Sequence, residues 1–270
     1  MRPEPVRPFL TGSGANQTMP ISDVQVVLAD TDTARLIHYQ LRYQVFCLET
    51  GFEDASNYLN GQEQDEFDDR SVHFIVRSKR SKEWLATARL ILPGERPLPI
   101  VRYCDVPLHT LRFARTAELS RLLIVGHVRR RHGDEKTPRK RGLIKQSPTL
   151  VAYQERHQTK SILVALIRAM AAYGLERDIP GAAFFITPAL ARILTQMGIG
   201  LTAIGDPCRH RGIRFPYISR AEQVYSTLTP LVEHDGSESH LTHHYELFSE
   251  LYNKKNPSLL EEPLVERFGT

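Results

Sequence analysis

Charged side chains that could take part in chemistry are concentrated in two segments of opposite sign. Residues 49–69 contain eight Asp or Glu and no Lys or Arg, a net charge of −8, whereas residues 126–145 contain eight Lys or Arg and two acids, a net charge of +6. Carboxylates accept protons from an incoming group, and clustered basic side chains attract anionic partners. The sequence therefore predicts two surfaces of opposite potential, although single charge runs are also typical of solvated loops.

The sequence lacks the motifs of several common enzyme classes. It contains no GxxxxGK(S/T), no GxGxxG after a strand, no GxSxG, no HExxH and no set of protein-kinase motifs. His240, His243 and His244 share one face of a predicted helix, but no carboxylate or thiol is placed to complete a site, so we expect no bound metal. Residues 209–211 lie in a turn bounded by Gly and Pro, and we expect them at the surface.

The composition is that of a folded domain. The chain has 270 residues, of which 41% are hydrophobic and 24% charged, with a formal net charge of +4, so it can bury a core and is not a disordered chain. No apolar run approaches the roughly 18–20 residues of a membrane helix, and Pro and Arg interrupt the first residues before a signal peptide could form. The odd set Cys47, Cys104 and Cys208 has no metal-ligand spacing, which predicts a reduced, cytoplasmic protein.

The elements that would position these groups follow from periodicity and from Gly and Pro. We expect a loose arm over residues 1–20, because that segment is rich in Pro, Gly, Ser and Thr. β-Prone runs predict strands at 24–28, 72–77, 84–92, 118–125, 182–187, 201–204 and 213–219. Apolar stripes predict helices from Thr31 through Leu48 and over 161–175, 188–197, 221–231 and 240–252. The acidic stretch, residues 49–69, is expected to be a loop, which we call the acidic loop.

This order predicts one α+β domain over residues 21–220. A basic insertion lies at about 126–158, and residues 221–270 form an appended helical C-terminal extension. The order of strand pair, strand, long helix, strand, helix and two strands resembles the GCN5-related N-acetyltransferase (GNAT) fold. The resemblance implies an α/β/α sandwich with a mixed central sheet. It also implies that the N-terminus of the long helix, near Thr159, receives phosphopantetheine phosphates. The Q/R-x-x-G-x-G/A loop of acetyltransferases is not visible before that helix.

Four short motifs resemble those of acyl-homoserine-lactone (autoinducer) synthases and N-acyl amino acid synthases. They appear in the order of those families: Arg42 before Phe46, an acid cluster of Glu63, Asp65, Glu66 and Asp68, Arg89 in ATARLILP, and Glu118 to Leu122 reading ELSRL. Phe52 stands where autoinducer synthases often have a Trp. In length, basic insertion and C-terminal helices the chain is similar to PEP-CTERM/exosortase system-associated acyltransferases.

The resemblance implies transfer of a long-chain fatty acyl group from acyl carrier protein, or from acyl-CoA, to the amino group of an amino acid. No permanently bound cofactor is implied. Glu118 would be the general base, with Ser120 and Arg121 beside it and strand N–H groups beyond Ser120 holding the oxyanion. The implied substrate-binding residues are Arg42, Phe46, Phe52, Asp65, Asp68 and Arg89. The arginines among them, with Arg121, would pair with Asp65 and Asp68 and fix the acidic loop over the acceptor pocket.

The basic insertion would bind the acidic acyl carrier protein. The expected docking residues are Arg129, Arg130, Arg131, Arg139, Lys140 and Arg141. Two alternatives remain open: a CoA-dependent N-acetyltransferase of the same fold, and a non-catalytic nucleic-acid-binding protein. The second is disfavoured because residues 126–145 contain no aromatic side chain on which a base could stack, so no nucleic-acid partner is expected.

Overall fold

The computed structural model describes residues 21–107, 111, 115–129, 148–233 and 244–253. The helices are α1 (Asp32–Tyr43), α2 (Ile100–Tyr103), α3 (Gly126–Arg129), α4 (Pro148–Glu176), α5 (Pro188–Gln196), α6 (Ala221–Glu233) and α7 (Phe248–Asn253). The strands are β1 (Val24–Leu28), β2 (Ser71–Ser78), β3 (Trp84–Ile91), β4 (Thr116–Ile124), β5 (Gly181–Ile186), β6 (Thr202–Ala203), β7 (Cys208–Arg209), β8 (Ile213–Arg220) and β9 (Glu246–Leu247). A π-helical segment, η2 (Gln44–Glu49), continues α1, and short 3-10 turns lie at η1 (Ile21–Asp23), η3 (Ala55–Asn57) and η4 (Asp68–Arg70).

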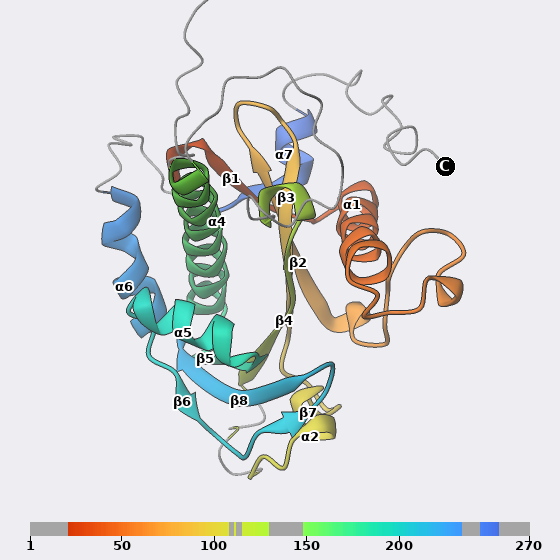
Figure 1. Cartoon of the computed structure of the whole chain (residues 1–270). Coiled ribbons are helices and arrows are strands. Elements are labelled where there is room, and N and C mark those ends of the chain that lie inside the picture. The colour runs from red at the N-terminus through yellow and green to blue at the C-terminus, as the bar shows by residue number, and fades with distance from the viewer. Residues whose placement is uncertain (1–20, 108–110, 112–114, 130–147, 234–243, 254–270) are drawn as a thin grey trace, which may run out of the picture.

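The strands form one mixed sheet with helices on both sides (Figure 1). Its order is β6-β8-β5-β4-β3-β2-β1-β9, and β7 pairs with β8 off this path. β4 and β5 run parallel, as do β1 and β9, and the other neighbours are antiparallel. The predicted α+β sandwich with a mixed central sheet is confirmed. Within the described residues, no helix combines the length and apolar character needed to cross a bilayer.

Successive residues of a strand point to opposite faces of the sheet, and this separates two layers. On β2, the ring of His73 lies 4.4 Å from that of His38 in α1, whereas the ring of the next residue, Phe74, lies 5.8 Å from that of Tyr173 in α4. α1 and α4 therefore cover opposite faces. We call these the α1 face and the α4 face.

The first helix begins where the sequence predicts. The Thr31 side chain accepts a hydrogen bond from the backbone N–H of Ala34 at 3.2 Å and caps α1. The predicted helix to Leu48 is only partly α-helical, because the last turn widens into the π-helical segment η2. π-Helical turns within α-helices are frequent at functional sites, and this one contains Phe46.

Two helix predictions need correction. The long helix begins at Pro148 and not near Thr159, so the end of the expected insertion is helical. A proline in the first turn loses no hydrogen bond, and it opens α4 just as Pro188 opens α5. The segment 240–252 is not one helix. Its described part forms β9, which extends the sheet beside β1, before α7 begins. A strand of two residues is too short to leave a periodic pattern.

The cysteine prediction also needs correction. Cys104, which follows α2, and Cys208 of β7 form a disulfide with 5.6 Å between their Cα atoms, and only Cys47 is free. A separation of 104 residues along the chain hides this pairing from inspection of spacing. The loose arm over residues 1–20 and most of the basic insertion lie outside the described residues.

Candidate active site

The centre of the sheet opens where β4 leaves β5. The two strands pair from Thr116 opposite Gly181 to Leu119 opposite Phe184, and no pairing follows beyond that point. On its other side β4 bulges against β3, and Arg121 in this bulge has a left-handed backbone with a φ of 51°. β-Bulges redirect side chains, and strained backbone is common at functional sites. The backbone of β4 beyond Ser120 is therefore free of a β5 partner.

Glu118 lies on the α1 face of β4, just before the strands part. Its side chain is 2% exposed, and Oε2 accepts a hydrogen bond of 2.8 Å from the backbone N–H of Ile100, the first residue of α2. Burial raises the pKa of Glu118 to about 7, although the Ile100 N–H and the charges of Arg89 and Arg121 oppose the rise. Glu118 forms no ion pair with Arg42 or Arg121. It is thus a carboxyl that changes charge near neutral pH.

The acidic loop is attached to the sheet and to α1 by three guanidinium groups, and the first is that of Arg42. This side chain is fully buried in α1. It pairs through Nε with Glu63, and Nη1 lies 2.6 Å from Asp68 Oδ1. A buried charge is tolerated only when it is paired and hydrogen-bonded, and two carboxylates meet that need here.

Arg89 of β3 is the second guanidinium. Its Nη1 pairs with Asp65 and lies 2.7 Å from Asp68 Oδ1, while Nη2 lies 3.0 Å from Asp65 Oδ2. Its Nε donates to Ser120 Oγ at 3.1 Å. The sheet register places Arg89 directly opposite Ser120. Arg89 therefore joins the loop to the part of β4 that follows Glu118.

Arg121 is the third. Its Nη2 lies 2.8 Å from Glu63 Oε1 and 2.9 Å from Asp65 Oδ2, and its guanidinium lies 5.6 Å from the centre of the Phe46 ring. The predicted meeting of the three arginines with Asp65 and Asp68 is present in the structure. Sequence reasoning missed Glu63 as a binding partner, although it begins the acid motif. We call these six charged groups the ion network: Arg42, Arg89, Arg121, Glu63, Asp65 and Asp68.

The arginines keep the carboxylates of the ion network ionised. Burial alone would raise the pKa values of Glu63, Asp65 and Asp68, but the neighbouring guanidinium charges and their hydrogen bonds outweigh it, and each pKa is lowered. Glu118 differs because no guanidinium of the described residues forms a hydrogen bond or an ion pair with it. The site thus holds carboxylates of two kinds: structural anions, and one carboxyl whose pKa is raised.

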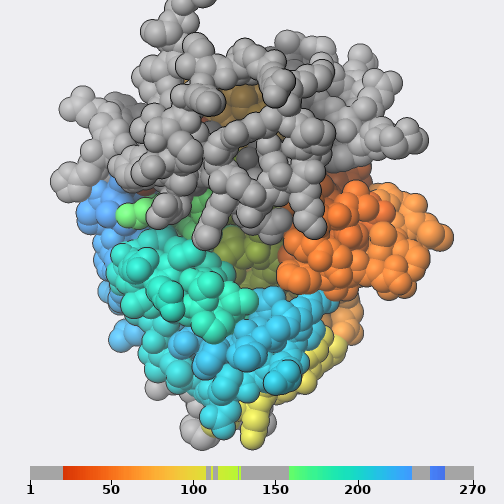
Figure 2. Space-filling view, in the orientation of Figure 1, coloured from red at the N-terminus to blue at the C-terminus, as the bar shows by residue number. Residues whose placement is uncertain are grey.

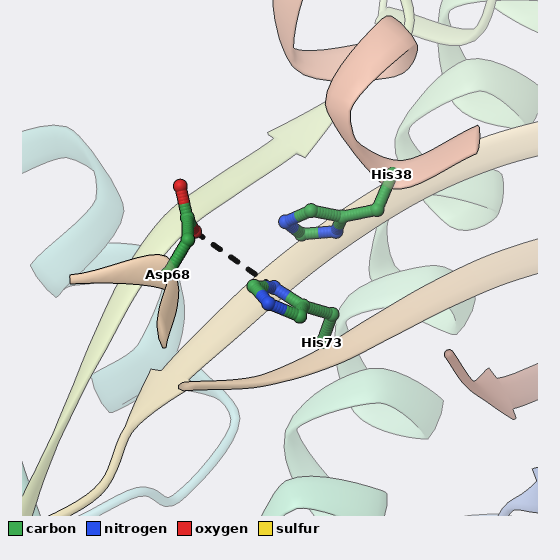
Figure 3. Close-up of side chains that lie close together, drawn as sticks. All are labelled: His38, Asp68 and His73. Atoms are coloured by element: carbon green, nitrogen blue, oxygen red, sulfur yellow. Dashed lines mark ion pairs between the residues drawn. The ribbon is translucent and has the colours of Figure 1, made fainter. Parts of the chain in front are cut away.

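Two histidines that sequence reasoning did not single out lie against the ion network (Figure 3). His38 Nδ1 shares a hydrogen bond with Thr87 Oγ1, and Asp68 Oδ1 lies 4.0 Å from His73 Nδ1. Burial lowers the pKa of His73 to about 4 and that of His38 well below its usual value, so both rings are neutral at pH 7.

This histidine pair with Asp68 has the residue types of a metal site, but its charge surroundings oppose one. Asp68 Oδ1 already accepts from both Arg42 and Arg89, and a divalent ion would lie beside two guanidinium charges. The two guanidinium charges therefore oppose binding of a divalent ion by this cluster. His244, from the earlier histidine group, instead interacts with the Tyr225 hydroxyl.

An apolar cavity lies on the α4 face, directly behind Glu118. Residues of β3, β4, α4, β5, β8 and α6 line it, including Ala117 and Leu119, the two neighbours of Glu118. Ser219 is the single polar side chain in this lining. Glu118 itself points to the opposite face and does not line the cavity. Sequence reasoning did not predict this cavity, because apolar residues that line a cavity look the same in sequence as those that fill a core.

The remaining predicted residues are placed as follows. Phe52 is 46% exposed in the acidic loop. Arg129 ends α3, and its side chain is not described. Arg130, Arg131, Arg139, Lys140 and Arg141 lie outside the described residues. In the space-filling view, surface in the colour of β4 lies in a hollow between the acidic loop, α5 and β8 (Figure 2).

Comparison with known proteins agrees with this architecture. Residues 41–137 match the family model for the acetyltransferase (GNAT) domain. The crystal structure of TofI in a ternary complex with an inhibitor and MTA superposes with a TM-score of 0.53 at 18% identity, covering 76% of this chain and 96% of TofI. The chain has the GNAT fold.

Two further solved structures are similar to the chain. The CoA-dependent acyl-homoserine lactone synthase BjaI, with SAM and isopentyl-CoA, gives a TM-score of 0.54 at 16% identity over 80% of this chain and 90% of BjaI. The AHL synthase LasI gives 0.52 at 16% identity over 77% and 94%. No curated protein matches the sequence. At these identities the likeness shows the shared fold.

Proposed function

We propose that this chain is an N-acyltransferase that moves a long-chain fatty acyl group from a thioester donor to the amino group of an amino acid or a similar small amine. The observation that carries the proposal is Glu118. Its pKa is raised to about 7, and it stands where β4 parts from β5, with the ion network on its own face and the apolar cavity behind the strand.

The chemistry needs a base because an amine arrives as an ammonium ion. Glu118 accepts the proton, directly or through one water, and the neutral nitrogen attacks the thioester carbonyl carbon. Backbone N–H groups of β4 beyond Ser120 stabilise the negative charge that develops on the carbonyl oxygen. The C–S bond then breaks, the proton held by Glu118 passes to the leaving thiolate, and the nitrogen gives up its second proton to Glu118, which releases it to solvent. The products are an amide and a free thiol.

The apolar cavity could take the acyl chain of the donor, but at about 30 Å³ it must widen to hold a long chain. Its lining offers hydrocarbon surface and one hydroxyl, so a fatty chain loses contact with water on entering it. The thioester would then lie at the divergence of β4 and β5, between the cavity and Glu118.

The ion network acts as a support for the acceptor side of the site. It fixes the acidic loop beside β4 and positions Phe46, with Ser120 held by Arg89. Because every carboxylate of the network is paired with a guanidinium, its role is to hold the loop in place and leave proton transfer to Glu118.

We propose acyl carrier protein as the donor, with acyl-CoA as the alternative that the bound isopentyl-CoA of BjaI suggests. The basic segment would bind the acidic carrier, as expected for the PEP-CTERM/exosortase-associated group, and a carrier donor would place the reaction in the cytoplasm. Replacing Arg129, Arg130 and Arg131 by Ser should raise the KM for acyl carrier protein and weaken its salt dependence, with kcat nearly unchanged. An unaltered KM at low salt would exclude docking there.

The test of the proposed function is direct product analysis. The purified protein is incubated with dodecanoyl acyl carrier protein, dodecanoyl-CoA or acetyl-CoA and a mixture of the twenty amino acids, and products are identified by mass spectrometry. We expect N-dodecanoyl amino acids from a long-chain donor. Formation of N-acetyl products alone would favour the CoA-dependent acetyltransferase alternative, and the absence of any amide would contradict the proposal.

A further inference from the structure

One arginine beside the ion network, Arg214, forms no ion pair with a carboxylate of the described residues. In the ion network three arginines face three carboxylates, and Arg211 pairs with Glu53 of the acidic loop. Arg214 of β8 adds a fifth guanidinium. Its Nε donates to the backbone carbonyl of His210 at 3.0 Å, and it forms no ion pair with an acidic side chain of the described residues. Arg214 is partly buried, so solvent only partly compensates its charge.

The β7–β8 hairpin places Arg214 next to the site. Arg214 lies opposite Cys208 in the hairpin, and the turn at Arg211 and Gly212 has left-handed backbone. From this turn Arg211 reaches Glu53, whose Oε1 is 3.8 Å from Arg121 Nη2. The hairpin is therefore joined to the ion network through Glu53.

Aromatic contacts connect the same hairpin to the Glu118 side of the sheet. The ring of His210 lies 3.9 Å from that of Tyr103 in α2 and 5.7 Å from that of Phe185. Phe185 follows the last residue of β5 that pairs with β4, and α2 is the helix whose first N–H binds Glu118. Arg214, which donates to His210, thus lies in the β7–β8 hairpin that packs beside α2 and β5, near the point where β4 and β5 diverge.

The electrostatics of this wall favour an anion. Burial lowers the pKa of Arg214, and so does repulsion by the nearby positive charge of Arg211. A carboxylate brought by a ligand would relieve that repulsion. The planar guanidinium offers two Nη groups for a bidentate contact while Nε stays on the His210 carbonyl.

We propose that Arg214 binds the carboxylate of the acceptor and thereby selects amines that carry a carboxylate. This inference rests on the proposed function, because the acceptor is the molecule that meets Glu118. Arg214 is a specificity-determining residue: it contributes to binding of the acceptor and of the acylated product, and it takes no part in proton transfer.

The experiment measures binding, so it does not depend on turnover. Isothermal titration calorimetry compares N-dodecanoylglycine with N-dodecanoylglycinamide, which has the same chain and amide but lacks the carboxylate. We expect the wild-type protein to bind the carboxylate probe about 10- to 100-fold more tightly, as charge-assisted hydrogen bonds do. Arg214→Gln should remove that preference and leave the affinity for the glycinamide unchanged.

Two further variants control for charge and folding. Arg209→Gln removes an exposed arginine from the partner strand of the same hairpin and should keep the preference. Arg214→Lys retains the charge without the planar fork and should keep part of it. Equal binding of both probes by the wild-type protein, or a full preference in Arg214→Gln, would overturn the role of Arg214 while the proposed function stands. Failure of the wild-type protein to bind either probe would overturn both proposals.

Discussion

The Arg42 side chain shows how single residues determine this site. It is buried in α1 yet charged, because Glu63 and Asp68 from a distant part of the chain surround it. Its Nη2 has no hydrogen-bond partner in the structure. A buried ion network of this kind adds little net stability compared with apolar packing, but the loss of one member is costly. Arg42 is thus required once the carboxylates are present.

Replacing Arg42 by Leu should reduce the free energy of unfolding by about 3–5 kcal/mol, because Glu63 and Asp68 lose a buried partner. Urea denaturation followed by circular dichroism measures the change. Arg35→Leu is the matched control, since Arg35 lies in the same helix and pairs with the exposed Asp32; such surface pairs contribute little. A loss of stability for Arg42→Leu as small as that for Arg35→Leu would show that the network does not hold the loop.

At the scale of elements, α4 and the parting strands β4 and β5 enclose the apolar cavity. Ala171 of α4 lines it, whereas Leu175, one turn later, is 40% exposed and is not part of the lining. If the acyl chain occupies this cavity, as we propose, the α4 side chains in its lining set the chain length that fits.

Ala171→Phe should shift the preferred donor to shorter acyl chains, because the larger ring occupies part of the cavity. The measurement is kcat/KM for donors from C4 to C16. Leu175→Phe adds similar bulk to the same helix outside the lining and should leave the preference unchanged. If Ala171→Phe kept the wild-type chain-length profile, the acyl chain would have to bind elsewhere.

The elements were predictable from the sequence where their patterns are long. β-Prone runs identified the hairpin of β2 and β3 as well as β4 and β5, and Thr31 marked the start of α1. The early start of α4 at Pro148 was not predictable, because the helix there continues through a polar stretch without an apolar stripe. The two-residue strands β7 and β9 exist because a neighbouring strand edge pairs with them, which a local pattern does not encode.

At the scale of the whole molecule, distant segments meet around Glu118. The motif order predicted that Arg42, Arg89 and Arg121 would contact Asp65 and Asp68. It did not reveal that Ile100 would bind Glu118 or that the cavity would lie on the opposite face, because both depend on three-dimensional packing. The Cys104–Cys208 disulfide links α2, which holds Glu118, to the hairpin that carries Arg214.

The disulfide determines how many thiols should react in the unfolded protein. Thiol titration of the unfolded, unreduced protein should detect one free thiol, that of Cys47, and three after reduction. Cys208→Ser should lower the free energy of unfolding by about 2–4 kcal/mol, since the bridge closes a long loop. Purification under inert gas with a metal chelator prevents oxidation during handling and leaves free thiols reactive. Three reactive thiols without reductant would contradict the bridge.

Glu118 gives the most direct test of the account as a whole. Glu118→Gln keeps an oxygen to accept from the Ile100 N–H but cannot accept a proton from the amine. With the raised pKa of about 7, wild-type kcat/KM should rise as pH increases through 7, because only the ionised carboxylate acts as a base, and should fall below it. Glu66→Gln removes an exposed carboxylate of the acidic loop and serves as the control.

The decisive measurement is therefore the pH dependence of N-acylation by wild-type, Glu118→Gln and Glu66→Gln proteins. We predict that Glu118→Gln loses about 10²- to 10⁴-fold in kcat and loses the inflection near pH 7, while Glu66→Gln behaves as wild type. Wild-type turnover in Glu118→Gln, or an unchanged inflection in that variant, would contradict the assignment of this carboxylate as the base.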